Sequence, residues 1–224
     1  MAGIETVTAA ADEPLGLTEV KDYLRLDDQV DDNFVRTFII AAREWAENYT
    51  NRAFITRTLR FHIDGVREAN RDLWEGGKVG PYQTFYKNFI EIPHPPLIAV
   101  SSVKYFDDSD NESTWATSNY YVDSIRQPAR IVLRDGGTFP TDLRNANGIQ
   151  VNYTAGYGST PSDVPEAIRV AMLQYCLFLY EHRGDFERYP APAMPNSIRQ
   201  LLQPYQIMRF GDHPYNKGYA VGIA

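Results

Sequence analysis

Four histidines and one cysteine are the side chains of this 224-residue sequence best suited to metal binding or nucleophilic chemistry. The histidines, His62, His94, His182 and His213, fall in four separate segments, and no two have the spacing that places metal ligands on one element. The single cysteine, Cys176, rules out an internal disulfide and any cysteine-based metal site. The sequence therefore predicts neither a metal nor a cofactor.

Motifs for nucleophilic catalysis and for phosphate binding are also missing from the sequence. It contains no G-x-S-x-G elbow, and its glycine-rich piece TAGYGST has the pattern of a strand end and a turn, not of a phosphate loop. The acidic pieces DDQVDD and DDSDNES lack the spacing of a calcium loop, so helix capping and a solvated hairpin turn explain them better. A Ser-His-Asp constellation stays open, because its members can lie far apart in sequence. We predict no catalytic residue and keep a hydrolase as a distant alternative.

Charge and hydropathy exclude further classes of protein. The formal net charge is -7 and there is no basic run, which argues against a general nucleic-acid binder, because phosphate contacts need clustered Lys and Arg. No stretch reaches the roughly 18 consecutive apolar residues of a membrane-spanning helix, and MAGIETVTAAADEPLG is no signal peptide. We expect a protein made in the cytoplasm that makes no contact with a membrane.

Three segments have the three-and-four spacing of apolar residues that predicts helices, at about 18–26, 32–50 and 163–183. Thr18 is the expected N-cap of the first, and Asp31 or Asp32 that of the second. The third is apolar over most of its circumference, which is typical of the helix at the centre of a small core. We therefore expect the second helix to pack on the third.

Between these helices, at about 57–154, the apolar period changes to two residues, which predicts half-buried strands. The candidates are RTLRFHID, NFIEI, LIAVSSVKYF, NYYVDSI, ARIVLR and GIQVNYTAGY, and we interpret them as an antiparallel meander. These patterns predict the α+β fold class, with helices on both sides of an antiparallel β region in sequence and an extended C-terminal tail. The main domain is expected at 1–188, followed by an arm at 189–224 that carries one short helix.

Six pieces of the sequence together resemble one family. They are LTEVKDYLRLDD, AAREWAENYTNRAF, IEIPHPPLIAVSSVKYFD, IQVNYTAGYG, DVPEAIRVAMLQYCLFLYEHRGD and SIRQLLQPY. In this order they resemble the head-to-tail connector, or adaptor, proteins of tailed bacteriophages. The sequence departs from the family in the loop at 65–88, which is longer, and in the extended terminus beyond Arg209.

The resemblance implies a mainly helical fold, a helical bundle with an inserted small antiparallel β-sheet. It also implies a structural virion protein of the neck, between head and tail, and not an enzyme. It implies a ring of about twelve copies of the chain beneath the portal protein, which extends the DNA channel and offers a platform to the next tail, stopper or nozzle protein. DNA would pass only as cargo, and an acidic wall would let it slide. The alternative is a stopper or tail-completion protein of the same particle.

Two segments are the expected contact sites of such a subunit, because interfaces concentrate aromatic and arginine side chains. The arm is the predicted portal anchor, through Ile198, Arg199, Leu201, Leu202, Tyr205, Arg209, Tyr215 and Tyr219. The alternative is that the arm folds back on its own subunit. The loop at 65–88 is the predicted contact with a neighbouring subunit or with the tail, through Trp74, Tyr82, Phe85 and Tyr86.

Overall fold

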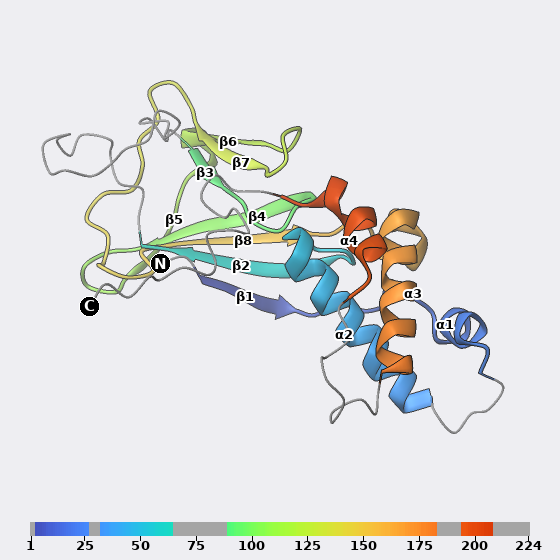
Figure 1. Cartoon of the computed structure of the whole chain (residues 1–224). Coiled ribbons are helices and arrows are strands. Elements are labelled where there is room, and N and C mark those ends of the chain that lie inside the picture. The colour runs from blue at the N-terminus through green and yellow to red at the C-terminus, as the bar shows by residue number, and fades with distance from the viewer. Residues whose placement is uncertain (1–2, 27–31, 65–88, 183–193, 208–224) are drawn as a thin grey trace, which may run out of the picture. The chain divides into compact units, whose positions relative to one another are not determined.

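The computed structural model describes residues 3–26, 32–64, 89–182 and 194–207, which belong to two compact units (Figure 1). One unit joins Met1–Pro14 to Ala53–Val164 and holds the strands. The other joins Leu15–Arg52 to Pro165–Ala224 and holds the described α-helices. The mixed α+β class is thus confirmed. The expectation of a mainly helical bundle is not, because the strands form two sheets.

The helical unit is built from both ends of the chain. Its described α-helices are α1 (Leu17–Leu24), α2 (Asp32–Thr50), α3 (Glu166–Glu181) and α4 (Asn196–Leu202). Helix α2 packs against α3, as its apolar face predicts. Ala42 and Ala46 of α2 and Ala171 of α3 are fully buried, and their small side chains let the helices approach closely.

Helix α1 begins earlier than the sequence suggests, with Gly16 rather than Thr18 as its N-cap. The Glu19 carboxylate accepts a hydrogen bond from the backbone N–H of Gly16 at 3.4 Å, so the first turn is capped by a side chain within it. Glu19 also pairs with Arg169 of α3 at 2.7 Å. One acidic residue therefore caps α1 and ties it to α3.

The strand unit contains a five-stranded and a three-stranded antiparallel sheet. The first has the order β1 (Gly3–Thr8), β2 (Arg57–Ile63), β8 (Ile149–Ala155), β4 (Leu97–Phe106) and β5 (Glu112–Thr114). The second has the order β3 (Phe89–Glu91), β7 (Arg130–Leu133) and β6 (Tyr120–Asp123). The predicted meander is wrong, because β2 pairs with β1 and with β8, the last strand of the unit, and not with β3, the strand that follows it in sequence.

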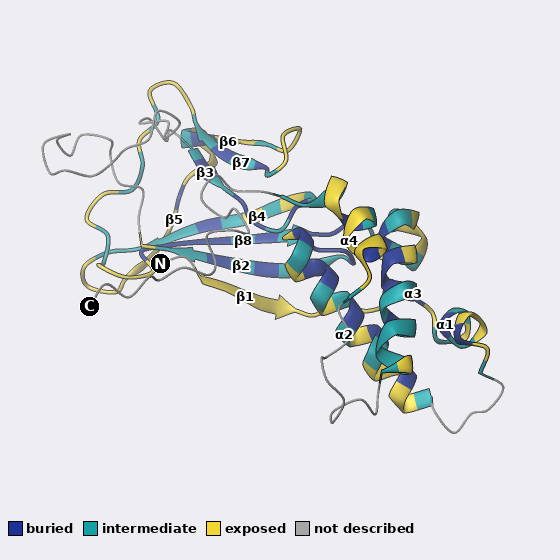
Figure 2. Cartoon of the chain, viewed as in Figure 1, coloured by how far each residue is buried: buried dark blue, intermediate teal, exposed yellow. Residues whose placement is uncertain are grey.

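Strands β1 and β5 lie outside the predicted set. All residues of both strands are exposed, so neither has the alternation of buried and exposed positions that marks a strand (Figure 2). The alternation is clear in β2, where Leu59 and Phe61 are buried between half-buried polar neighbours. The two edge strands of the five-stranded sheet, β1 and β5, are therefore held by backbone pairing with their neighbours and not by burial of an apolar face.

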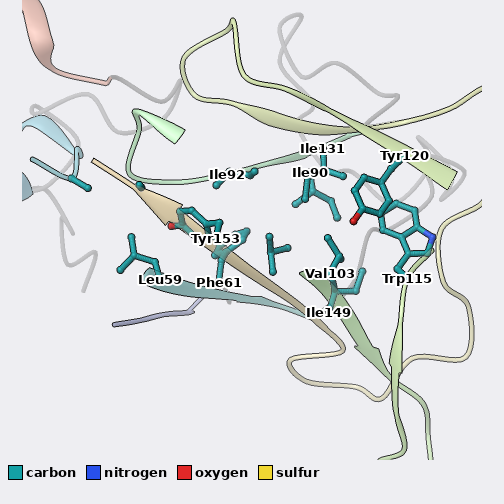
Figure 3. Close-up of a cluster of buried hydrophobic side chains, with 13 residues drawn as sticks. Leu59, Phe61, Ile90, Ile92, Val103, Trp115, Tyr120, Ile131, Ile149 and Tyr153 are labelled. Carbon is teal, nitrogen blue, oxygen red and sulfur yellow. The ribbon is translucent and has the colours of Figure 1, made fainter. Parts of the chain in front are cut away.

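The core of the strand unit lies between its two sheets. Leu59, Phe61, Val103, Ile149 and Tyr153 come from the five-stranded sheet, and Ile90, Ile131 and Tyr120 from the three-stranded sheet (Figure 3). The fully buried hydroxyl of Tyr153 donates a hydrogen bond to the carbonyl oxygen of Pro93 at 3.0 Å. This bond satisfies polar groups that burial would otherwise leave unpaired.

Replacing Tyr153 with phenylalanine tests this part of the core. We expect the free energy of unfolding to fall by about 1–3 kcal/mol, because the Pro93 carbonyl loses its buried donor. The exposed Tyr121 is the control, and its replacement by phenylalanine should change stability by less than about 0.5 kcal/mol. Denaturant titration of both variants measures the difference, and equal stability would show that the hydrogen bond contributes nothing.

Candidate functional site

The groups that most often carry chemistry are dispersed or inert in this structure. Burial raises the pKa of the Cys176 thiol to about 12, so it stays protonated, and it donates to the carbonyl oxygen of Phe38. His62 lies in β2, His94 follows β3, and His182 ends α3. In the described part of the chain no three histidine, cysteine or acidic side chains gather as metal ligands. The features described next are surfaces of the helical unit and of the strand unit.

Side chains of α2 and α3 form one continuous row of stacked rings on the helical unit, here called the aromatic band. Its members are Tyr49, Trp45, Tyr175, Phe178 and His182, and each is only partly buried. Successive ring centroids lie 5.4, 4.7, 6.2 and 4.5 Å apart. Stacked rings bury large area and lose little conformational freedom, as side chains in protein interfaces do.

The aromatic band borders a groove of about 320 Å³ between α3 and α4. Leu177, Phe178 and Pro195 make its apolar surface, and Gln174, Glu181, His182 and Ser197 its polar rim. The Ser197 hydroxyl donates to the Gln174 side chain at 3.2 Å, which links α4 to α3 beside the groove. His182 stacks on Phe178, and its Nδ1 lies 2.8 Å from the Phe178 carbonyl oxygen. These contacts fix the α3 side and the α4 side of the groove relative to each other.

The short helix predicted as a portal anchor packs on its own chain. Ile198 and Leu202 of α4 are fully buried, and α4 contacts both α3 and α2. After α4, the backbone N–H of Ile207 donates to the carbonyl oxygen of Thr50 at 3.0 Å. It thereby satisfies an acceptor at the C-terminal end of α2, a group that a helix leaves without an internal partner.

Of the predicted portal-binding residues, Arg199 is exposed, whereas Leu201 and Tyr205 are partly buried. Arg209, Tyr215 and Tyr219 lie outside the described residues, as do Trp74, Tyr82, Phe85 and Tyr86 of the predicted subunit or tail contact. The spacing of apolar residues in the arm does form an apolar helix face. That face, which contains Ile198 and Leu202, is buried where α4 packs against α3 and α2. Periodicity identifies an apolar face, not the surface that covers it.

The strand unit has its own exposed apolar positions. Strand β1 is an edge strand whose Ile4 and Val7 are 43% and 46% exposed, and the β6–β7 hairpin presents Ile125 with 96% of its surface exposed. The sequence places Ile125 at the end of a strand candidate and predicts the turn from Arg126 onward, whereas the structure ends β6 at Asp123 and includes Ile125 in the connection. Across the described ranges, no helix is long and apolar enough to span a membrane.

Comparison with known proteins gives one family and one fold. Residues 15–127 match the model of the family described as phage gp6-like head-tail connector protein. No curated protein matches the chain.

Solved structures similar to this chain come from gene transfer agent (GTA) particles. A chain from the neck of an empty GTA particle with C6 symmetry has a TM-score of 0.71 and 22% identity, over 93% of this chain and 97% of that chain. One from the neck of a native particle with C12 symmetry has a TM-score of 0.62 and 21% identity, over 93% and 97%. A third, from the virion of a native particle, has a TM-score of 0.69 and 20% identity, over 92% and 96%. At these identities the similarity establishes the fold.

Replacing Ile198 with alanine tests whether α4 belongs to the helical core. We expect a loss of about 2–4 kcal/mol in the free energy of unfolding, because a fully buried side chain leaves a cavity. Replacing the adjacent, exposed Arg199 with alanine should cost less than about 0.5 kcal/mol. Denaturation followed by far-ultraviolet circular dichroism measures both, and an Ile198 variant as stable as the parent would contradict this packing.

Proposed function

The chain belongs to the phage gp6-like head-tail connector proteins, and from this premise we propose that it is a ring-forming subunit of the neck of a phage or phage-like particle. The observation that carries the proposal is the family match over residues 15–127. A connector is a structural protein, which accounts for a sequence without a catalytic motif. The match favours a connector over the stopper or tail-completion protein kept as an alternative.

The proposed ring holds twelve copies, a number supported by the C12 symmetry of one similar neck structure. A closed ring needs two different surfaces on each subunit, one for each neighbour. The exposed hairpin of the strand unit and the α3–α4 groove of the helical unit are two such surfaces. In such a ring each surface contacts a different surface of the neighbouring subunit, whereas in a two-fold dimer each surface would contact the same surface of its partner.

The proposed partners at the two faces of the ring are the portal protein and the next tail, stopper or nozzle protein. Ile198 and Leu202, which the sequence suggested as portal contacts, are buried in the helical unit. We therefore propose that the portal binds groups of the arm that remain exposed or lie further along the chain. These are Arg199 and the segment after Ile207, which contains Arg209, Tyr215 and Tyr219. Arginine at such a site would pair with carboxylates of the portal.

DNA is the proposed cargo of the ring and not its ligand. The net charge of -7 supports this role, because an acidic subunit repels phosphate and lets a duplex move. A wall rich in lysine and arginine would instead hold the duplex through its phosphates.

Mixing the purified full-length chain with the portal protein of its own particle tests the proposal. We expect native mass spectrometry to give one portal ring carrying twelve copies of the chain, even if the isolated chain is monomeric, since the portal supplies a template. Particles made without the chain should contain filled heads that lack tails. Complete tailed particles assembled without the chain would contradict the proposal.

A further inference from the structure

The β6–β7 hairpin presents one apolar side chain to solvent at its tip. Residues 124–129 connect the two strands, and within them Ile125 is 96% exposed while Ala129 is buried. Burying a side chain of this size stabilises a contact by roughly 1.5–3 kcal/mol. A nearly fully exposed isoleucine on a loop is therefore a candidate contact point.

The base of this hairpin is held firmly. Asp123 accepts hydrogen bonds from the Arg130 side chain at 2.9 Å and from the backbone N–H of Ile125 at 3.3 Å. The Arg130 guanidinium also lies over the ring of Phe89, and the Ala129 carbonyl accepts from the backbone N–H of Ile92 at 2.8 Å. Because its base is fixed, the tip can bind with a small loss of conformational entropy.

The α3–α4 groove has the size and lining to receive such a side chain. An apolar cavity of about 150 Å³ holds a benzene ring, so a groove of about 320 Å³ has room for one isoleucine side chain. Leu177, Phe178 and Pro195 supply the apolar contacts. In this structure Ile125 is exposed, so the groove of its own chain does not hold it.

The charges beside the two surfaces are opposite. Arg126 follows Ile125 and is exposed, and Glu181 is exposed on the rim of the groove. Neither side chain makes an ion pair with another residue of the described segments. Opposite charges around an apolar contact select the matching partner and fix its orientation.

We propose that neighbouring copies of this chain interlock by inserting Ile125 of one copy into the α3–α4 groove of the next, with Arg126 facing Glu181. The inference rests on the proposed function, because it names the contact between subunits of the ring. The two surfaces are different and lie on one chain, so the contact is head-to-tail and can repeat around a closed ring. Because the apolar tip, the groove and the two opposite charges all belong to this chain, a second copy is the occupant we assign, over the portal or a tail protein.

Charge exchange tests the pairing across this contact. With the portal as template, Arg126→Glu and Glu181→Arg alone should each lower ring formation by about tenfold or more, and the double variant R126E/E181R should restore it. Ile125→Asp should also prevent ring formation, while Ile98→Asp, at an exposed isoleucine of β4, should leave it unchanged. Circular dichroism checks that every variant folds.

Cross-linking tests the geometry directly. The double variant I125C/S197C, oxidised on the portal, should give a ladder of covalent oligomers that collapses on reduction, and neither single variant should do so. Cys176 is buried and does not compete. Rings that form without a ladder, and that survive both charge reversals, would overturn this contact and leave the proposed function standing. A disulfide from the I125C variant to the portal or to a tail protein would overturn it as well. A wild-type chain that forms no ring on the portal would instead refute the proposed function.

Discussion

The packing of α2 against α3 is the interaction on which the rest of the structure depends. Strands β2 to β8 all lie between these helices in sequence. The two helices can therefore pack together only if the end of α2 and the start of α3 are brought close to each other. Two backbone hydrogen bonds do this. The N–H of Thr56 donates to the carbonyl oxygen of Gly158 at 2.8 Å, and the N–H of Tyr157 donates to the carbonyl oxygen of Phe54 at 2.9 Å. The outgoing and returning segments are thus joined before β2 and after β8. Buried alanines then allow α2 and α3 to pack closely.

This arrangement leaves apolar and aromatic surface open on the helical unit. Helix α3 is apolar on more sides than its own unit covers, so the aromatic band and the α3–α4 groove remain partly open. The strand unit contributes an exposed hairpin tip with a fixed base. A subunit that must bind two neighbours needs rigid surfaces of this kind.

Sequence patterns predicted the features that depend on local periodicity. Leu59 and Phe61 alternate with polar residues and form a strand, and the spacing along Asp32–Thr50 gives a helix with those bounds. Features that depend on distant contacts were missed. β1 is exposed on both faces and exists by pairing with β2. The spacing of Ile198 and Leu202 showed an apolar face, but only the fold shows that this face is buried within the helical unit. The sequence marks a turn at RQPA, directly after Ile125, but it does not show that Ile125 itself belongs to the loop and is exposed.

The central claim is that copies of this chain form a closed ring through two different surfaces. A high-resolution cryo-electron microscopy reconstruction of the particle neck tests it most directly. The account predicts twelve copies related by rotation, each with the β6–β7 hairpin of one subunit against helices α3 and α4 of the next. Copies paired by two-fold axes, or separated copies without lateral contacts, would contradict it.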